Sequence, residues 1–340
     1  PIVAKQGDYG LIKLVKGQDE HLIVPLVENL LATELSGTTC VLTRTNEEAL
    51  QISGFLNVRG MPAKLMQTNE GFNLFNLWEI RFFLNRLNLT DETVVINDEI
   101  WEHAKRELKI TFNQNPKMDM IGALINDFEE INPKQKYKSD LEVFIKESKL
   151  EDFIHDGADT ILVSTMHKAK GKEFDNVFIM LSNFSAFSDE QRRLLYVAMT
   201  RAKKLLSIYF NVDIFESINA DGIERHTIRK RHLPPPEMVM HLSHRDVHLG
   251  YFKYVQKNIE AIKVGDSLLR AENGWANSNG KTILKFSKQF GDRLTAVEKK
   301  GYLLREVKIG FIVFWKGDKM EEEIKIILPE LYFRNIDFGA

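Results

Sequence analysis

The first 69 residues alternate between apolar runs of strand length and longer segments with a helical period. Three runs predict strands, at 11–15, 38–44 and 62–67. Two segments between them predict helices, at 19–34 and 45–60. Thr45 and Glu48 form the signature of a capping box, and Gly60 stands where a helix ends. Alternating strands and helices predict a parallel sheet covered by helices.

Residues 70–155 are more polar, and their pattern is helical. Four helices are predicted there, at 77–87, 99–108, 120–131 and 140–154. Strand patterns resume at 160–166, 176–182 and 205–210. We therefore predict one α/β domain, discontinuous in sequence (1–69 and 156–224), that is interrupted by a helical insertion at 70–155.

The stretch "LLYVAMTRAKK" (194–204) runs from six uncharged residues into a group of cations. If it is one helix, Arg201 lies in line with Leu194 and Val197 on an apolar face. Burying an unpaired guanidinium is costly, so the side chain either reaches solvent or meets an anion. Arginine suits phosphate because its planar fork offers paired donors and keeps its charge.

The composition changes again after residue 224. The stretch 225–239 is basic and contains Pro234–Pro236, which favour an extended linker. Its cations are Arg225, Arg229, Lys230 and Arg231. They either form a solvated tether or bind a nucleic-acid backbone. Residues 240–340 read as short strands with a helix at 287–301 and a hairpin tip at 316–319, which predicts a small β-rich domain.

The bulk composition is that of an ordinary globular protein, with 44% apolar and 28% charged residues in 340. The net charge of −2 neither favours nor excludes nucleic acid, so any basic surface is local. The single cysteine, Cys40, has no partner within the chain, which fits a reducing cytoplasmic location. We expect no membrane span and no leader, and the start at Pro1 suggests a piece of a longer protein.

Two polar sites follow predicted strands, where open α/β sheets bind ligands. The loop "HKAKGKEF" (167–174) surrounds Gly171 with lysines, although a plain surface turn explains it equally well. Arg44 is the last residue of the strand predicted at 38–44 and precedes a helix; the alternative for this residue is a surface ion pair.

Three other patterns imitate functional motifs. "NGKT" (279–282) resembles the end of a phosphate-binding loop, but Trp275 stands where glycine is required, so a hairpin turn is favoured. "VVINDE" (94–99) imitates a strand that ends in metal-binding acids, but it lies in the helical region and favours a helix start. His241, His244 and His248 suggest zinc, but without a second cysteine we predict no metal site.

Together the segments resemble the C-terminal half of superfamily 1 DNA helicases of the UvrD/Rep type. "CVLTRTNEEALQISGFLNVRGMPAKLMQ" resembles their motif IV region, and "GFNLFNLWEIRFFLNRLNL" the segment after it. "VSTMHKAKGKEFDNVFIM" resembles motif V, and "RRLLYVAMTRAKKLL" resembles motif VI. The resemblance covers about residues 10–210, and the β-rich part is similar to tails of large RecQ-family helicases.

The resemblance implies a RecA-like parallel-sheet domain and specific roles for its residues. Arg201 and Arg44 would act as arginine fingers on the γ-phosphate of ATP, which another domain holds. Gly171 and Glu173 match positions on the nucleotide side. The positions implied for single-stranded DNA are Thr165, His167, Lys168 and Tyr196.

The sequence departs from the family's pattern in ways that shape the prediction. Thr43 replaces a tyrosine that stacks on the base, and the helical insertion is short. Neither a phosphate-binding loop nor a strand-borne Asp-Glu pair occurs, so we expect the first motor domain to lie outside this chain.

We predict the second motor domain of an ATP-dependent DNA helicase in repair, which uses ATP and Mg²⁺ and acts on single-stranded or forked DNA. Its partner would be the N-terminal RecA-like domain of the same protein, and this segment alone would be inactive. The alternative is a non-catalytic module that binds nucleic acid or a protein partner.

Overall fold

The computed structural model describes residues 10–65, 73–90, 92–148, 160–185, 188–218, 222–317 and 320–336. The chain divides into two units. Unit 1 comprises Pro1–Thr68, Asp156–Met238 and Asn335–Ala340, and unit 2 comprises Asn69–His155 and Val239–Arg334.

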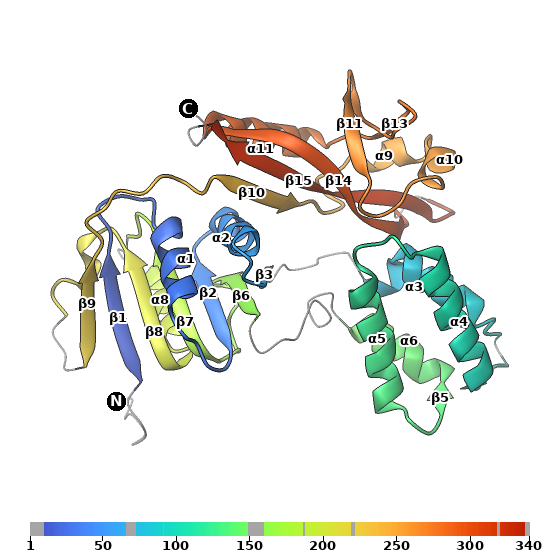
Figure 1. The fold of residues 1–340 in the computed structure, drawn as a ribbon, viewed down its shortest axis with the longest axis horizontal. Helices are drawn as coiled ribbons and strands as arrows, with labels where there is room; N and C mark the ends of the chain where they lie inside the picture. Colours follow the sequence, from blue (N-terminus) through green and yellow to red (C-terminus); the bar gives the residue numbers. More distant parts are fainter. Residues whose placement is uncertain are drawn as a thin grey trace. The chain divides into compact units, whose positions relative to one another are not determined.

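Unit 1 is built on a seven-stranded sheet with the order β3-β6-β2-β7-β8-β1-β9, in which all pairings are parallel (Figure 1). The strands are β1 (Leu11–Lys16), β2 (Thr39–Thr43), β3 (Ala63–Leu65), β6 (Ile161–Thr165), β7 (Phe174–Leu181), β8 (Ala202–Phe210) and β9 (Ile223–Thr227). β2 and β7 are almost wholly buried, as central strands of a sheet covered on both faces must be. The predicted α/β class with a parallel sheet is confirmed.

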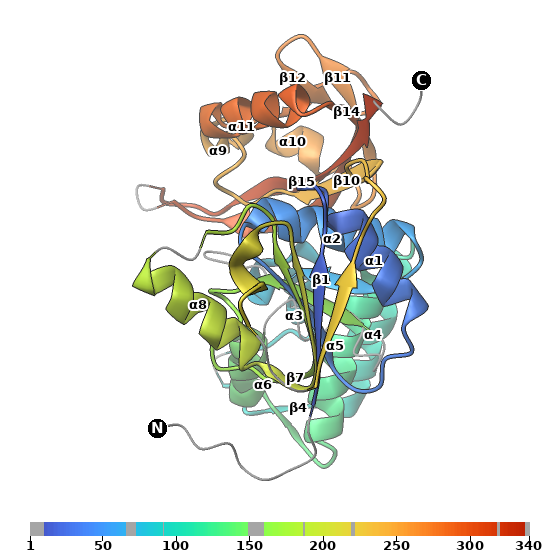
Figure 2. The same cartoon turned by 90° about the vertical axis from the view of Figure 1, so that its left-hand side faces the viewer.

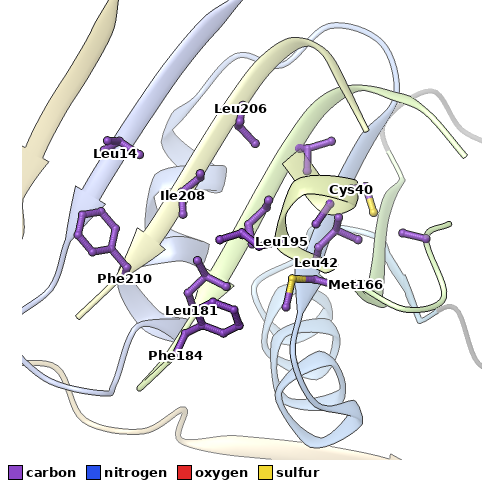
Figure 3. Close-up of a cluster of buried hydrophobic side chains, with 14 of the residues drawn as sticks. Leu14, Cys40, Leu42, Met166, Leu181, Phe184, Leu195, Leu206, Ile208 and Phe210 are labelled. Atoms are coloured by element: carbon purple, nitrogen blue, oxygen red, sulfur yellow. The ribbon is translucent and has the colours of Figure 1, made fainter. Parts of the chain in front are cut away.

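Helices cover the two faces of this sheet, as the edge-on view in Figure 2 shows. One face packs against α1 (Ile23–Ala32) and α2 (Asn46–Val58). The other packs against α8 (Asp189–Met199) and the connection 166–173, and its apolar cluster appears in Figure 3. Cys40 is fully buried in that cluster, and burial raises the pKa of its thiol.

The predicted ends of α2 are confirmed. Thr45 Oγ1 accepts a hydrogen bond from the Glu48 backbone, and the Glu48 carboxylate accepts one from Thr45 N. Gly60 follows the helix with φ of +79°, a conformation that residues with a Cβ rarely adopt.

The helix predicted to carry Arg201 is shorter than expected. α8 ends at Met199, and Arg201 lies in the turn before β8, so it does not share a helical face with Leu194 and Val197. The turn is set by Thr200, whose N–H bonds to the Tyr196 carbonyl and whose hydroxyl donates to the Val197 carbonyl. The sequence did not mark this end, because neither glycine nor proline stands between Met199 and β8.

In unit 2 the four helices predicted between 70 and 155 are present. They are α3 (Trp78–Arg86), α4 (Asp98–Thr111), α5 (Met118–Ile131) and α6 (Lys138–Glu147), with a single turn η1 (Leu74–Asn76) before them. The predicted helix start in "VVINDE" is confirmed, because Asn97 is the N-cap of α4. The short strand β4 (Val95–Ile96), which precedes it and pairs with β5 (Lys136–Tyr137), was not predicted. The end of the fourth predicted helix lies outside the described residues.

The remainder of unit 2 contains a six-stranded sheet with the order β10-β15-β14-β11-β12-β13. Its strands are β10 (Glu237–His241), β11 (Ser267–Ala271), β12 (Gly274–Ala276), β13 (Thr282–Leu284), β14 (Tyr302–Trp315) and β15 (Ile324–Asn335). Its helices are α9 (Leu249–Phe252), α10 (Gln256–Ile259) and α11 (Lys288–Lys299). "NGKT" lies at the β12–β13 hairpin, as predicted. Part of the predicted tip at 316–319 lies outside the described residues.

The helical and β-rich parts of unit 2 are joined by specific contacts. Leu77 forms an isolated bridge with Val313 of β14. The Arg81 guanidinium lies 4.3 Å from the Phe75 ring centroid and 5.6 Å from that of Phe314. These contacts explain why the two segments, predicted as separate regions, fall within one unit.

The predicted linker at 225–239 is only partly free of regular structure. Its first residues belong to β9, which adds a strand to the edge of the parallel sheet beside β1. Arg225 donates hydrogen bonds to the carbonyls of Phe215 and Ile218, at the turn η2 (Asp213–Phe215) and just beyond it. The exposed residues 229–231 follow.

Candidate functional site

Arg201 lies at the amino edge of the parallel sheet, where β7 and β8 begin. Its Nε donates to the Val197 carbonyl at 2.9 Å, and one terminal nitrogen donates to the Lys172 carbonyl at 3.2 Å. The other donates to Thr200 Oγ1 at 3.2 Å. Three of the five N–H groups are thus used on neutral acceptors, and two are left for a ligand. The guanidinium is held in place without being neutralised.

Gly171 and Glu173 lie on the same edge, in the segment that leads into β7. Gly171 has φ of +86°, and an added Cβ would meet nothing within 4 Å, so the backbone angle rather than crowding favours glycine. The Glu173 carboxylate lies 3.5 Å from Lys203 Nζ, and both side chains are more than half exposed. Phe174 N donates to the Arg201 carbonyl at 2.8 Å, which links this segment to the arginine turn.

Asp175 fixes this amino edge, although the sequence analysis did not single it out. The pairing of β7 with β8 is irregular between Phe174 and Asn176. The Asp175 carboxylate accepts from Lys204 Nζ at 2.9 Å and from the backbone N–H of Thr38 at 2.9 Å. The Lys204 ammonium, followed by the Thr38 bonds, lowers the pKa of Asp175 to about 2. The available signal was an acidic residue immediately before the strand predicted at 176–182.

Thr165, His167 and Lys168 lie at the opposite, carboxyl edge, where β6 ends. Thr165 is nearly buried, and its carbonyl accepts hydrogen bonds from the N–H groups of Lys168 and Ala169. His167 is exposed, and Lys168 Nζ donates to Asn46 Oδ1 at 3.1 Å. The end of β6 and the start of α2 therefore meet at this edge.

Arg44 is also at the carboxyl edge. It follows β2 and is exposed, and its guanidinium donates a long hydrogen bond, 3.4 Å, to the Asn183 carbonyl beyond β7. Asn183 is joined to Asn211, beyond β8, by two hydrogen bonds of 2.7 and 2.8 Å. The ends of three neighbouring strands thus form a continuous polar border.

The structure does not bring Arg44 and Arg201 together. The β2–β7 register places Arg44 level with Leu181 at the end of β7, whereas Arg201 bonds to Phe174 at its start. Seven residues of strand separate these levels, about 20 Å. The two arginines therefore lie at opposite edges of one sheet. Which ligand each of them binds stays a prediction.

Thr43 and Tyr196 occupy contrasting positions. Thr43 is fully buried in β2, where its hydroxyl donates to the Thr45 carbonyl at 2.8 Å, so it cannot stack on a base. Tyr196 is 52% exposed on α8, which makes its ring available to a ligand.

The described residues contain no group of three or more His, Cys, Asp or Glu side chains that could hold a metal ion. His241 lies 3.4 Å from the Glu330 carboxylate, so it has a structural partner. Burial lowers the pKa of His244, with Arg245 acting in the same direction. None of the described helices combines the length and the apolar character needed to cross a membrane.

Comparison with known proteins identifies related sequences. Residues 91–213 match the family described as "UvrD-like helicase C-terminal domain". The chain is 40% identical over 190 residues to the probable DNA helicase II homolog of Mycoplasma genitalium, which covers 49% of this chain and 27% of that protein. It is 36% identical over 168 residues to the ATP-dependent DNA helicase PcrA of Staphylococcus epidermidis, and the alignment covers 44% of this chain and 22% of that protein.

A third relative is the ATP-dependent DNA helicase Rep of Buchnera aphidicola, which is 24% identical over 223 residues, or 57% of this chain and 33% of that protein. The aligned parts span a third or less of each of these three relatives. The matches confirm the resemblance to the C-terminal half of UvrD/Rep-type helicases.

Proposed function

Starting from the confirmed similarity of this chain to the C-terminal half of UvrD/Rep-type helicases, we propose that unit 1 is the second motor domain of an ATP-dependent DNA helicase. Its amino edge would act on ATP, and its carboxyl edge would bind single-stranded DNA. One observation carries the proposal. The connection from Thr165 to Glu173 runs from the carboxyl edge of the sheet to its amino edge, and it ends beside Arg201.

On the ATP side, Arg201 is the group that meets the γ-phosphate. Its two unused N–H groups and its undiminished charge suit the negative charge that develops during phosphoryl transfer. The exposed Glu173 carboxylate can accept a hydrogen bond from a sugar hydroxyl. These residues fit one side of a nucleotide. The phosphate-binding loop and the Mg²⁺ ligands would belong to the N-terminal RecA-like domain.

On the DNA side, we assign Arg44 to the strand rather than to ATP, because it lies with His167 and Lys168. Arg44 and Lys168 would bind phosphates, and the hydrogen bonds to the Thr165 carbonyl would fix the loop that carries His167. Tyr196 is exposed, but its carbonyl accepts from Thr200 in the turn before Arg201, toward the amino edge, so we do not assign its ring to the DNA path. Binding through phosphates is nearly independent of sequence and weakens with salt.

The connection between the edges gives a physical route for coupling. Met166 and Ala169 are fully buried in the core beneath α8, so the connection is anchored along its length. A shift of its nucleotide end, made when the γ-phosphate leaves Arg201, would be transmitted to its DNA end because packed cores move as units.

The test is ATP hydrolysis by the intact protein that contains this chain, measured with and without single-stranded DNA. We expect DNA-stimulated turnover from the intact protein and none from the 340-residue chain alone. Turnover by the purified chain that Arg201→Ala abolishes would contradict the assignment of the phosphate-binding loop to another domain. Absence of turnover from the intact protein would favour the non-catalytic alternative.

A further inference from the structure

Three consecutive cations, in the segment that follows β9, have no partners among the described residues. Arg229, Lys230 and Arg231 are exposed, and within the described parts of the chain none of them makes a hydrogen bond or an ion pair. Arg225, four residues earlier, is instead bound to two backbone carbonyls. The structure thus separates one structural arginine of this basic stretch from three cations whose charge is uncompensated.

The strand register places these cations at the carboxyl edge of the sheet. Thr227, the last residue of β9, pairs with Lys16 at the end of β1, and Lys16 pairs with Phe210 at the end of β8. Phe210 in turn pairs with Leu181, which is level with Arg44. Residues 229–231 therefore begin just beyond the edge that carries Arg44, and in Figure 1 the chain runs from there toward β10.

The carboxylates nearest in register on this edge are already engaged. Asp213 and Glu216 both bind Lys16 Nζ, the former at 2.6 Å. Glu20 accepts from Asn183 Nδ2 at 2.7 Å. These acids lie on the loops that border β9 and β1, and the described residues of these loops supply no partner for the three cations. Pro234–Pro236 follow, and their restricted backbone limits how far the segment can fold back onto the sheet.

We propose that Arg229, Lys230 and Arg231 form the far end of the single-stranded DNA path along the carboxyl edge, where they bind phosphates. This inference rests on the proposed function. From β6, which carries His167, to β9 is five steps across the sheet, about 24 Å. A single strand that crosses this width presents several successive phosphates to the protein. Single-stranded DNA is flexible and carries regularly spaced negative charges. It can therefore bind cations that are spread over this distance.

The test is a titration of the intact protein with a fluorescein-labelled oligothymidylate of about 20 nucleotides at several salt concentrations. Each phosphate contact on a single strand contributes about 0.7 to the slope of log K against log salt. We therefore expect the Arg229→Ala, Lys230→Ala, Arg231→Ala triple variant to have a slope shallower by about two. The Arg229→Lys, Arg231→Lys variant keeps the charge and should keep the parent's slope.

A matched control removes three exposed lysines of unit 2, Lys253, Lys257 and Lys299, and should leave the slope unchanged. An equal slope change in that control, or no change in the triple variant, would overturn the proposal. Binding by the parent protein would still support the proposed function in either case. A parent that shows no salt-dependent binding would overturn both. If the triple variant loses affinity only for polyglutamate and not for the oligonucleotide, the segment docks an acidic protein and the proposal is wrong.

Discussion

Arg81 in unit 2 and Arg201 in unit 1 are both partly buried arginines, but their surroundings differ. Arg81 is stacked on Phe75, and its guanidinium lies 2.9 Å from the Glu323 carboxylate. Arg201 is held by the carbonyls of Val197 and Lys172, and among the residues that the structure describes no carboxylate forms an ion pair with it. A carboxylate neutralises a cation, whereas neutral carbonyls position it and leave its charge for a ligand. The same residue type is thus structural in one unit and available in the other.

The largest expected effect is on Arg201. In the intact protein, Arg201→Ala should lower kcat for ATP hydrolysis by about 10³, by analogy with other arginine fingers. It should reduce the free energy of unfolding by only about 1 kcal/mol, because the lost bonds are to neutral acceptors. Steady-state kinetics and thermal unfolding check the two parts. Arg59→Ala, at the end of α2, is the control and should keep kcat; a collapse of folding in Arg201→Ala would make Arg201 structural as well.

In unit 2 the buried carboxyl of Glu79 allows a test of the pH dependence of stability. Burial raises the pKa of this carboxyl to about 7, although its bonds to the backbone and to Asn115 oppose the shift. The folded state therefore binds the proton more tightly than the unfolded state. Its contribution, on the order of 3 kcal/mol, is complete below about pH 4.5 and is lost as the pH rises through about 7.

Glu79→Gln should remove this component of the pH dependence of unfolding. All four tryptophans of the chain, Trp78, Trp101, Trp275 and Trp315, belong to unit 2, so urea titration followed by tryptophan fluorescence reports on that unit. Glu272→Gln, on the exposed β11–β12 turn, should keep the parent's profile. Parallel pH profiles for the parent and Glu79→Gln would show that Glu79 does not titrate in this range.

Arg81→Ala should destabilise unit 2 by about 2 kcal/mol, because it removes a desolvated cation–ring stack together with an ion pair. Arg86→Ala is a matched control on the same helix. Arg86 lies over the Phe82 ring and 3.9 Å from Glu107 at an exposed position. Its loss should cost less than about 1 kcal/mol, as is usual for exposed pairs. Urea titration compares the two. Equal losses in the free energy of unfolding would mean that the contacts of Arg81 with the β-rich part add no more stability than the exposed contacts of Arg86.

The smallest expected effect is on Arg44. Arg44→Ala should weaken binding of single-stranded DNA about tenfold and change kcat by less than that factor at saturating DNA, because Arg44 lies at the carboxyl edge, where it bonds to the Asn183 carbonyl. Fluorescence anisotropy with a labelled oligonucleotide measures the affinity. An unchanged affinity for DNA with a large loss of kcat would show that Arg44 acts on ATP.

The sequence predicted most of the architecture of unit 1, because its signals are local. The capping box at Thr45 and Glu48 and the buried strands on either side of Gly171 are set by neighbouring residues. The separation of Arg44 from Arg201 was not predictable in this way, since it depends on which end of a strand each residue follows after the sheet has assembled. The contacts of Arg81 with Phe314 also escaped prediction, because they join segments far apart in the chain that carry no complementary pattern.

The central claim is that the two edges of the parallel sheet serve different ligands, and one paired measurement tests it. ATP turnover and single-strand affinity are measured for Arg201→Ala and Arg44→Ala in the intact protein. The account predicts that Arg201→Ala loses turnover and keeps its DNA affinity, while Arg44→Ala loses affinity and keeps its turnover at saturating DNA. If both substitutions abolish turnover and leave affinity intact, the two arginines act on the same phosphate and the assignment of the edges is contradicted.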